Sequence, residues 1–225
     1  MLRSGLSLVA LFAVATTAFS QTPRVELVPT LGYAWGGQIL VQERAFQFKD
    51  LDVDISSSGN FGLRLDIPLG KAWALEFLAQ RQETQLKDDQ ALFGETPGGF
   101  VEPGSTHILD LQVNTVQVGL LWFASQGSTR WHLGLASGIS HLNFLLPLPS
   151  DTVMSYSVGA GVQLELSEHL AVRFEGRYFA ANTDEQLRAT YAFANPDCQA
   201  PCTYTFSYKD WLTQTWLTTG LAIRF

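Results

Sequence analysis

Apolar and polar residues alternate with a period of two along most of the chain, which is the pattern of β-strands whose two faces meet different surroundings. In MSYSVGAGVQLEL (154–166), Tyr156 and Val158 share one face and Gln163 lies on the other. LAVRFEGRYF (170–179) sets Val172 and Phe174 against Arg173 in the same way. Because no helical period competes in these stretches, they are predicted to be strands.

The pattern predicts eight strands in all, at residues 24–35, 58–69, 73–84, 107–123, 131–143, 154–166, 170–182 and 206–225. The apolar residues change parity within the fourth segment, which predicts a β-bulge near Asn114–Thr115. Pro29 lies inside the first segment and cannot donate to a ladder, so a second irregularity is expected there.

The connections between these segments alternate in length. Three are short (70–72, 124–130 and 167–169), and four are longer (36–57, 85–106, 144–153 and 183–205). Short turns at one end and longer loops at the other are typical of outer-membrane barrels, whose tilted strands cross the bilayer with about 9–11 residues. The predicted fold is an all-β, eight-stranded antiparallel up-and-down transmembrane β-barrel.

The aromatic residues lie at strand ends, as expected for side chains that anchor a barrel at both membrane interfaces. This predicts an aromatic girdle made of Trp73, Trp122, Trp131 and Phe225 near the short turns, and Trp35 and Trp211 at the opposite ends. In a water-soluble β-sandwich, nothing would favour aromatic side chains at the ends of the strands.

The amino-acid composition further narrows the possible classes of protein. The chain has 225 residues, 46% hydrophobic and 16% charged, with a net charge of −7. The apolar content excludes a disordered chain. No segment after the N-terminal region has the 18 or more apolar residues of a spanning helix. The acidic balance argues against binding nucleic acid, which needs a basic face.

The N-terminus predicts export. Arg3 precedes the apolar run LSLVALFAVA, and Ala18-Phe19-Ser20 then resembles a cleavage site. Residues 1–20 are therefore expected to be a signal peptide and residues 21–225 the barrel domain. In an oxidising compartment, Cys198 and Cys202 in CQAPC are expected to form a local loop disulfide rather than a metal site.

Several stretches resemble the eight-stranded OmpA-like and OmpW-like barrels of bacterial outer membranes. WLTTGLAIRF (216–225) resembles the C-terminal signal of such proteins, and VGAGVQLELSEHLAVRFEGRYF (158–179) resembles the hairpin of their sixth and seventh strands. LQVNTVQVGLLWF (111–123) and RWHLGLASGIS (130–140) resemble their fourth and fifth strands. The resemblance implies an outer-membrane location with periplasmic termini and extracellular long loops. It also implies contact with lipid and lipopolysaccharide, and recognition of the C-terminal strand by the barrel-assembly machinery. No cofactor is implied.

Charged and amide side chains collect on the parity opposite the apolar face, so they are predicted to lie in the lumen. The predicted lumen network comprises Arg64, Asp66, Glu76, Asp110, Glu165, Arg173, Glu175, Arg177 and Arg224, together with Gln80, Gln82, Gln112 and Gln163. Because isolated buried charges are costly, they should pair across the interior. Such a network either seals the barrel or rearranges to open a narrow pore.

The sequence supports neither a catalytic triad nor a calcium site. The four His residues (His107, His132, His141 and His169) form no convincing triad with Ser and an acid, so no catalytic residue is predicted. The run Asp50, Asp52 and Asp54 lacks the glycine and glutamate of a calcium loop, so no metal site is predicted.

The predicted function is that of a non-enzymatic surface barrel with a structural or loop-mediated role. The alternative is passage of small solutes or hydrophobic compounds. The resemblance to OmpW-like barrels implies that hydrophobic compounds are possible ligands. The apolar residues in or near the long loops are nevertheless expected to pack on each other over the barrel mouth; they are Phe93, Phe100, Phe144, Leu145 and Leu146.

Overall fold

The computed structural model describes residues 24–43, 49–87, 107–126, 128–144, 150–183, 188–193, 202–209 and 211–225. The described strands are β1 (Glu26–Trp35), β2 (Gly37–Glu43), β3 (Lys49–Ile55), β4 (Ser58–Pro68), β5 (Trp73–Lys87), β6 (His107–Gln126), β7 (Thr129–Phe144), β8 (Asp151–Glu165), β9 (Leu170–Asn182), β10 (Arg188–Phe193), β11 (Cys202–Lys209) and β12 (Trp211–Arg224).

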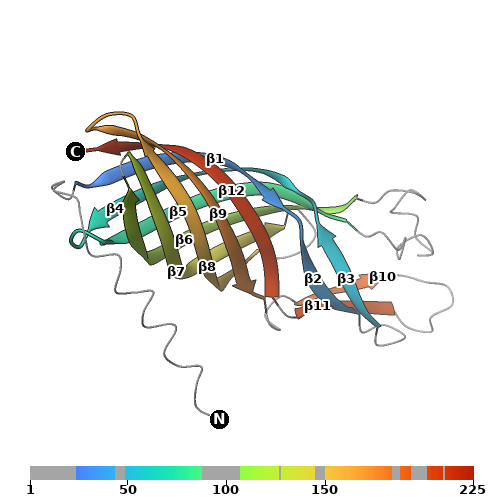
Figure 1. Ribbon diagram of the computed structural model, residues 1–225. Coiled ribbons are helices and arrows are strands. Elements are labelled where there is room, and N and C mark those ends of the chain that lie inside the picture. The colour runs from blue at the N-terminus through green and yellow to red at the C-terminus, as the bar shows by residue number, and fades with distance from the viewer. Residues whose placement is uncertain are drawn as a thin grey trace, which may run out of the picture.

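Eight of these strands close into a barrel. Around the ring, β5, β4, β1, β12, β9, β8, β7 and β6 follow one another, and β6 pairs back onto β5. Every pairing is antiparallel. Figure 1 shows the tilted strands wrapping around a common axis. Closure leaves these eight strands without a free edge, and the predicted fold is confirmed.

The two ends of the barrel differ. The turns at 69–72, at Ser128 and at 166–169 lie at one end, here called the short-turn end. The C-terminus lies there too, because the backbone NH of Phe225 donates to the carbonyl of Val25 at 3.1 Å. The ends of β5, β7 and β9 and the starts of β6, β8 and β12 lie at the opposite end, here called the long-connection end (Figure 1).

At the long-connection end the sheet continues beyond the barrel. β1 passes into β2 after Gly36, β2 pairs with β3, and β11 joins β2 on one side and β10 on the other. The sequence analysis treated 36–57 and 183–205 as connections and 206–225 as one strand. These predictions were wrong in part, since β2, β3 and β10 occupy the connections and the last segment divides into β11 and β12.

The two predicted irregularities had different outcomes. β6 pairs with β7 in an unbroken register from Leu111 to Gln126, so the bulge predicted near Asn114–Thr115 is wrong. The parity change arises instead because the apolar residues Leu111 and Val113 point into the barrel, whereas Val116 and Val118, nearer the short-turn end, point outward. At Pro29 the pairing of β1 with β12 is interrupted between Leu27 and Thr30 without a change of register, as a residue lacking an NH requires.

The alternation of the strands gives the barrel an apolar outside. Leu31, Leu135 and Val158 on different strands are all more than half exposed, whereas their neighbours in sequence point inward. No helix in the described part of the chain is long and apolar enough to cross a membrane.

Candidate functional site in the barrel interior

A charged network crosses the middle of the barrel. Inward parity brings together side chains from β4, β5, β7 and β9 that are far apart in sequence. This central network consists of Arg64, Asp66, Glu76, His132, Arg173, Glu175 and Arg177, all of them buried. Its three arginines face three carboxylates, so the network is balanced in formal charge.

Glu175 is the hub of the central network. Its Oε2 accepts a hydrogen bond from Nη1 of Arg64 and another from Nη2 of Arg173 at 2.7 Å. Its Oε1 accepts from Nε of Arg177 at 2.7 Å. His132 Nε2 lies 2.8 Å from Oε2. One carboxylate thus binds side chains from three strands, and charge-assisted bonds of this kind are the strong ones.

The other two carboxylates complete the pairing. Arg173 Nη1 donates to Asp66 Oδ2 at 2.6 Å, joining β9 to β4. Arg177 Nη2 donates to both Glu76 oxygens, at 2.7 Å and 3.0 Å, joining β9 to β5. Cross-barrel bonds of this kind hold opposite walls together, and they leave the charges inside the barrel compensated.

Small residues on β8 make room for the network. A Cβ atom at Gly159 would lie 3.1 Å from Oε1 of Glu175 and 3.2 Å from Nε of Arg177. A Cβ atom at Gly161 would lie 2.6 Å from His132 Nε2. Glycine at these two positions therefore allows the large side chains of β7 and β9 to lie flat against the β8 wall.

A second charged group lies nearer the short-turn end. This end cluster consists of Glu26, Arg130, Gln163, Glu165 and Arg224. Glu26 Oε1 accepts from Nη1 of Arg130 at 2.8 Å and from Nε of Arg224 at 2.9 Å, and its Oε2 accepts from Gln163. Nη2 of Arg224 also donates to Glu165 at 3.1 Å. The short-turn half of the interior thus holds two charge-balanced groups, beside smaller apolar clusters such as that of Leu121 and Phe123.

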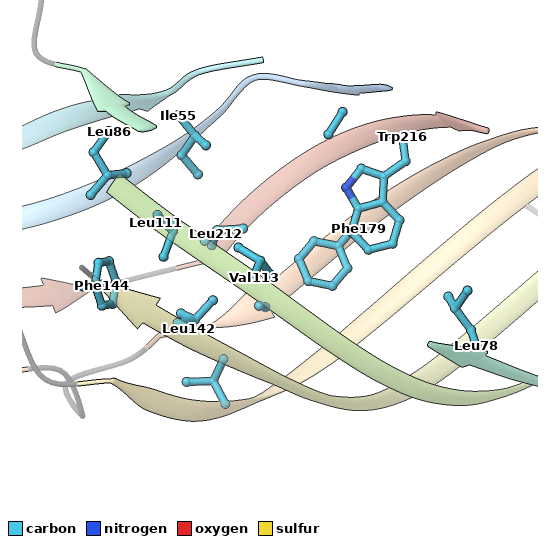
Figure 2. Packing of buried hydrophobic residues seen from close by; sticks show 13 residues of the cluster. Ile55, Leu78, Leu86, Leu111, Val113, Leu142, Phe144, Phe179, Leu212 and Trp216 are labelled. Carbon is cyan, nitrogen blue, oxygen red and sulfur yellow. The ribbon is translucent and has the colours of Figure 1, made fainter. Parts of the chain in front are cut away.

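The half of the interior nearer the long-connection end holds a large apolar cluster beside uncharged polar side chains. Its buried apolar side chains form one cluster, here called the apolar half: Ala34, Ile55, Leu78, Leu86, Leu111, Val113, Leu142, Phe144, Val153, Phe179, Ala181, Leu212 and Trp216. The Phe179 ring stacks on Trp216 with the centroids 4.4 Å apart and an interplanar angle of 17°. Figure 2 shows these two rings side by side, with Leu111, Leu142 and Phe144 further along the cluster. An up-and-down barrel with a purely polar lumen would lack this cluster.

Eight of the nine predicted lumen residues line the interior in these two groups. Asp110 does not. It shares its parity on β6 with Val116 and Val118, which are exposed, and Gln85 Nε2 donates to it on that outward face. Gln112 also points outward and lies against Arg81. Both predictions were wrong because they assumed a bulge that β6 does not have.

The predicted aromatic girdle is exposed at both barrel ends. The exposed members are Trp35, Trp73, Trp131, Trp211 and Phe225, whereas Trp122 is half-buried. The predicted disulfide and signal peptide cannot be compared with the structure, because Cys198 and residues 1–20 lie outside the described residues. Of the apolar residues expected to pack near the mouth, Phe144 lies in the apolar half and the others fall outside the described ranges.

Sequence reasoning missed Glu26, Arg130 and His132 as interior residues. Arg130 had been assigned to a turn, because the fifth strand was predicted to begin at Trp131. The alternation of the strand could have identified two of them. Arg130 and His132 flank Trp131, which is exposed, so both side chains point into the barrel. Within the described ranges, no three His, Cys, Asp or Glu side chains are arranged to hold a metal ion.

Solved structures with the same architecture come from outer membranes. OprG from Pseudomonas aeruginosa matches with a TM-score of 0.64 at 11% identity, over 92% of this chain and 99% of that chain. AlkL, solved in lipid bilayers, matches with a TM-score of 0.55 at 11% identity, over 94% of both chains. The outer-membrane protease OmpT from Escherichia coli matches at 0.49 and 11% identity, over 92% of this chain and 99% of that chain. At these identities the similarity to OprG and AlkL shows the fold alone.

No curated protein matches the sequence. A family model does: the outer membrane protein beta-barrel domain matches residues 4–197. With its closed eight-stranded ring and apolar exterior, the chain belongs to this family of bacterial outer-membrane β-barrels.

Proposed function

We propose that the protein is a non-enzymatic outer-membrane barrel that takes up small hydrophobic compounds into the apolar half of its interior. The long-connection end faces the outside of the cell and the short-turn end faces the periplasm. The charged networks close the periplasmic half to ions. The protein thus admits apolar solutes from one side without opening an aqueous pore.

The observation that carries this proposal is the division of the interior. A barrel of eight strands is just wide enough to be filled by side chains or to hold one small ligand. The large apolar cluster lies nearer the outside, beside buried amides and hydroxyls that carry no charge, while the charged and paired side chains lie nearer the periplasm. Apolar solutes gain free energy on leaving water for surroundings like those of the apolar half.

The uptake proposal is tested by watching Trp216. The protein is labelled with fluorinated tryptophan, placed in lipid nanodiscs and studied by fluorine NMR, with the Trp216 signal assigned from a Trp216→Phe variant. We expect n-octane to shift the Trp216 signal at concentrations that leave the signals of Trp35, Trp73 and Trp131 unchanged. Equal shifts at all four positions would mean that octane merely dissolves in the lipid, and would contradict uptake.

The ion-conducting alternative is tested separately. In planar bilayers, we expect no conductance above that of protein-free lipid, because every carboxylate of the central network accepts a bond from an arginine. Discrete channel openings in the wild-type protein would contradict the closed barrel. If they occurred and Glu175→Ala changed their size, the pore would run through the central network.

A second candidate function is binding of a partner by the segments beyond the barrel. The observation in its favour is the pairing of β2 with β11, which joins the first and last long connections into one sheet. Lipopolysaccharide is the proposed neighbour of this surface, and the barrel-assembly machinery is the proposed partner of the C-terminal strand during insertion. Shortening the segments 85–106 or 183–205 should abolish the binding of the surface partner by intact cells. Uptake of octane into the barrel should be unaffected.

A further inference from the structure

One wall of the barrel holds buried polar atoms that lack partners. These atoms are Oγ1 of Thr30, both amide atoms of Asn60, both amide atoms of Gln80, Oε1 of Gln82 and Nε2 of Gln214, and none has a hydrogen-bond partner among the described residues. All five residues are at most 5% exposed. Such atoms are rare in proteins, because a buried polar atom without a hydrogen-bond partner is destabilising.

These residues share one stretch of wall. They lie on β12, β1, β4 and β5, which are consecutive in the ring. Asn60 is the register partner of Gln82, and Gly62 of Gln80. We call Asn60, Gln80, Gln82 and Gln214 the amide wall.

The amide wall borders the apolar half. Gln214 is opposite Phe179 in the β12–β9 register, and Trp216 Nε1 donates to Gln214 Oε1 at 3.3 Å. On β5, Gln80 is followed towards the short-turn end by Leu78 and then by Glu76 of the central network. Gln214 thus lies beside the stacked aromatic rings, and on β5 one inward residue, Leu78, separates Gln80 from the central network.

The facing wall is different. Gln117 on β6 donates to Ser155 Oγ at 3.1 Å and accepts from Ser157 Oγ at 2.6 Å. Thr115 and Ser140 bond to each other at 2.8 Å. The polar residues of that wall satisfy one another, whereas Thr30 and the residues of the amide wall keep atoms without a partner among the described residues.

We propose that the ligand of the interior is a small hydrophobic compound that ends in an uncharged group able both to donate and to accept hydrogen bonds, such as an alcohol. Its apolar part lies against Phe179 and Trp216, and its polar end binds the amides of Gln80 and Asn60. An amide offers both a donor and an acceptor, which suits a hydroxyl. A charged end is disfavoured because each neighbouring arginine already faces a carboxylate and its charge is compensated. This inference rests on the proposed uptake function and names its substrate class.

The test compares three probes with one chain length: n-octane, 1-octanol and octanoate. Each is titrated into nanodiscs while the Trp216 fluorine signal is followed, and free concentrations are corrected with protein-free nanodiscs. We expect 1-octanol to bind about five- to tenfold more tightly than n-octane, the effect of roughly one net hydrogen bond. Octanoate should bind more weakly than 1-octanol.

Matched variants locate the preference. Gln80→Met removes both unsatisfied atoms with little change in volume, and should bring the affinity for 1-octanol down to that for n-octane. Gln117→Met makes the same change on the facing wall and should leave the preference intact. Asn60→Leu is a second variant of the amide wall, and it should reduce the preference if Gln80→Met fails to fold.

The outcomes separate the two proposals. If no probe shifts Trp216, uptake itself is wrong. If n-octane and 1-octanol bind equally, or if Gln80→Met and Asn60→Leu keep the preference, uptake stands and the inferred substrate class is wrong. Tighter binding of octanoate than of 1-octanol would also overturn the uncharged class.

Discussion

At the scale of single residues, Glu175 contributes most to the order of the interior. It binds Arg64, Arg173 and Arg177, and each of these is almost completely buried. A buried ion network adds little net stability compared with apolar packing, but removal of one partner is costly because the remaining charges are left unpaired. The network therefore favours one arrangement of the barrel strands over the alternatives.

We expect Glu175→Gln to lower the free energy of unfolding by about 3–5 kcal/mol, because three buried arginines lose a shared counter-charge. Urea unfolding in lipid vesicles, followed by tryptophan fluorescence, measures the change. The control is Glu83→Gln, which removes the exposed Arg81–Glu83 pair and should cost at most about 1 kcal/mol. Equal losses in both variants would contradict a structural role for Glu175.

At the scale of elements, the junction between β1 and β2 decides whether the sheet continues past the barrel. β2 crosses close to β12 at Gly37, where a Cβ atom would overlap the carbonyl oxygen of Thr213 and lie 3.2 Å from Gln214 Cγ. Only glycine permits this approach of two backbones. The extension of β2, β3, β10 and β11 depends on it, since β2 is the strand that β11 joins.

Gly37→Val should therefore separate β2 from β12 and weaken the pairing of β2 with β11. Hydrogen exchange is expected to become at least tenfold faster at the β2 and β11 amides, while the amides of β7 and β8 stay protected. Gly59→Ala is the matched control, because a Cβ atom there meets nothing closer than 3.9 Å. Unchanged exchange in Gly37→Val would show that the extension forms without this contact.

At the scale of the whole molecule, the barrel combines an apolar exterior with an interior that changes character along its axis. Closure satisfies the strand backbone without water, as a chain in lipid requires. The exposed Trp35 and Trp211 at one end and Trp73 and Trp131 at the other bound the apolar band. The same closure brings Arg173 to Asp66 across 107 positions of sequence.

The proposed orientation predicts which end is reachable from outside. An epitope inserted within residues 88–106 should bind antibody on intact cells, and one inserted after Gly70, in a short turn, should bind only after the outer membrane is permeabilised. Flow cytometry measures both, and heat-dependent gel mobility verifies that each variant is folded. Antibody binding to the Gly70 insertion on intact cells would reverse the orientation.

The sequence by itself determined the eight strands of the ring and their alternation, because a period of two is a local property that each segment carries alone. It also assigned Arg173, Glu175 and Arg177 to the interior, since their parity opposes that of Phe174 and Tyr178. Only the tertiary structure decided which charges pair, because partners such as Arg177 and Glu76 meet through ring closure.

The apolar half also required the tertiary structure. In a sequence, an apolar residue of a membrane strand is assigned to the lipid face, so Leu111 and Val113 appeared to require a bulge that would keep them outside. The unbroken register of β6 instead places them in the lumen and turns Asp110 outward. Register is set by the neighbouring strands and the closure of the ring, which no single segment records.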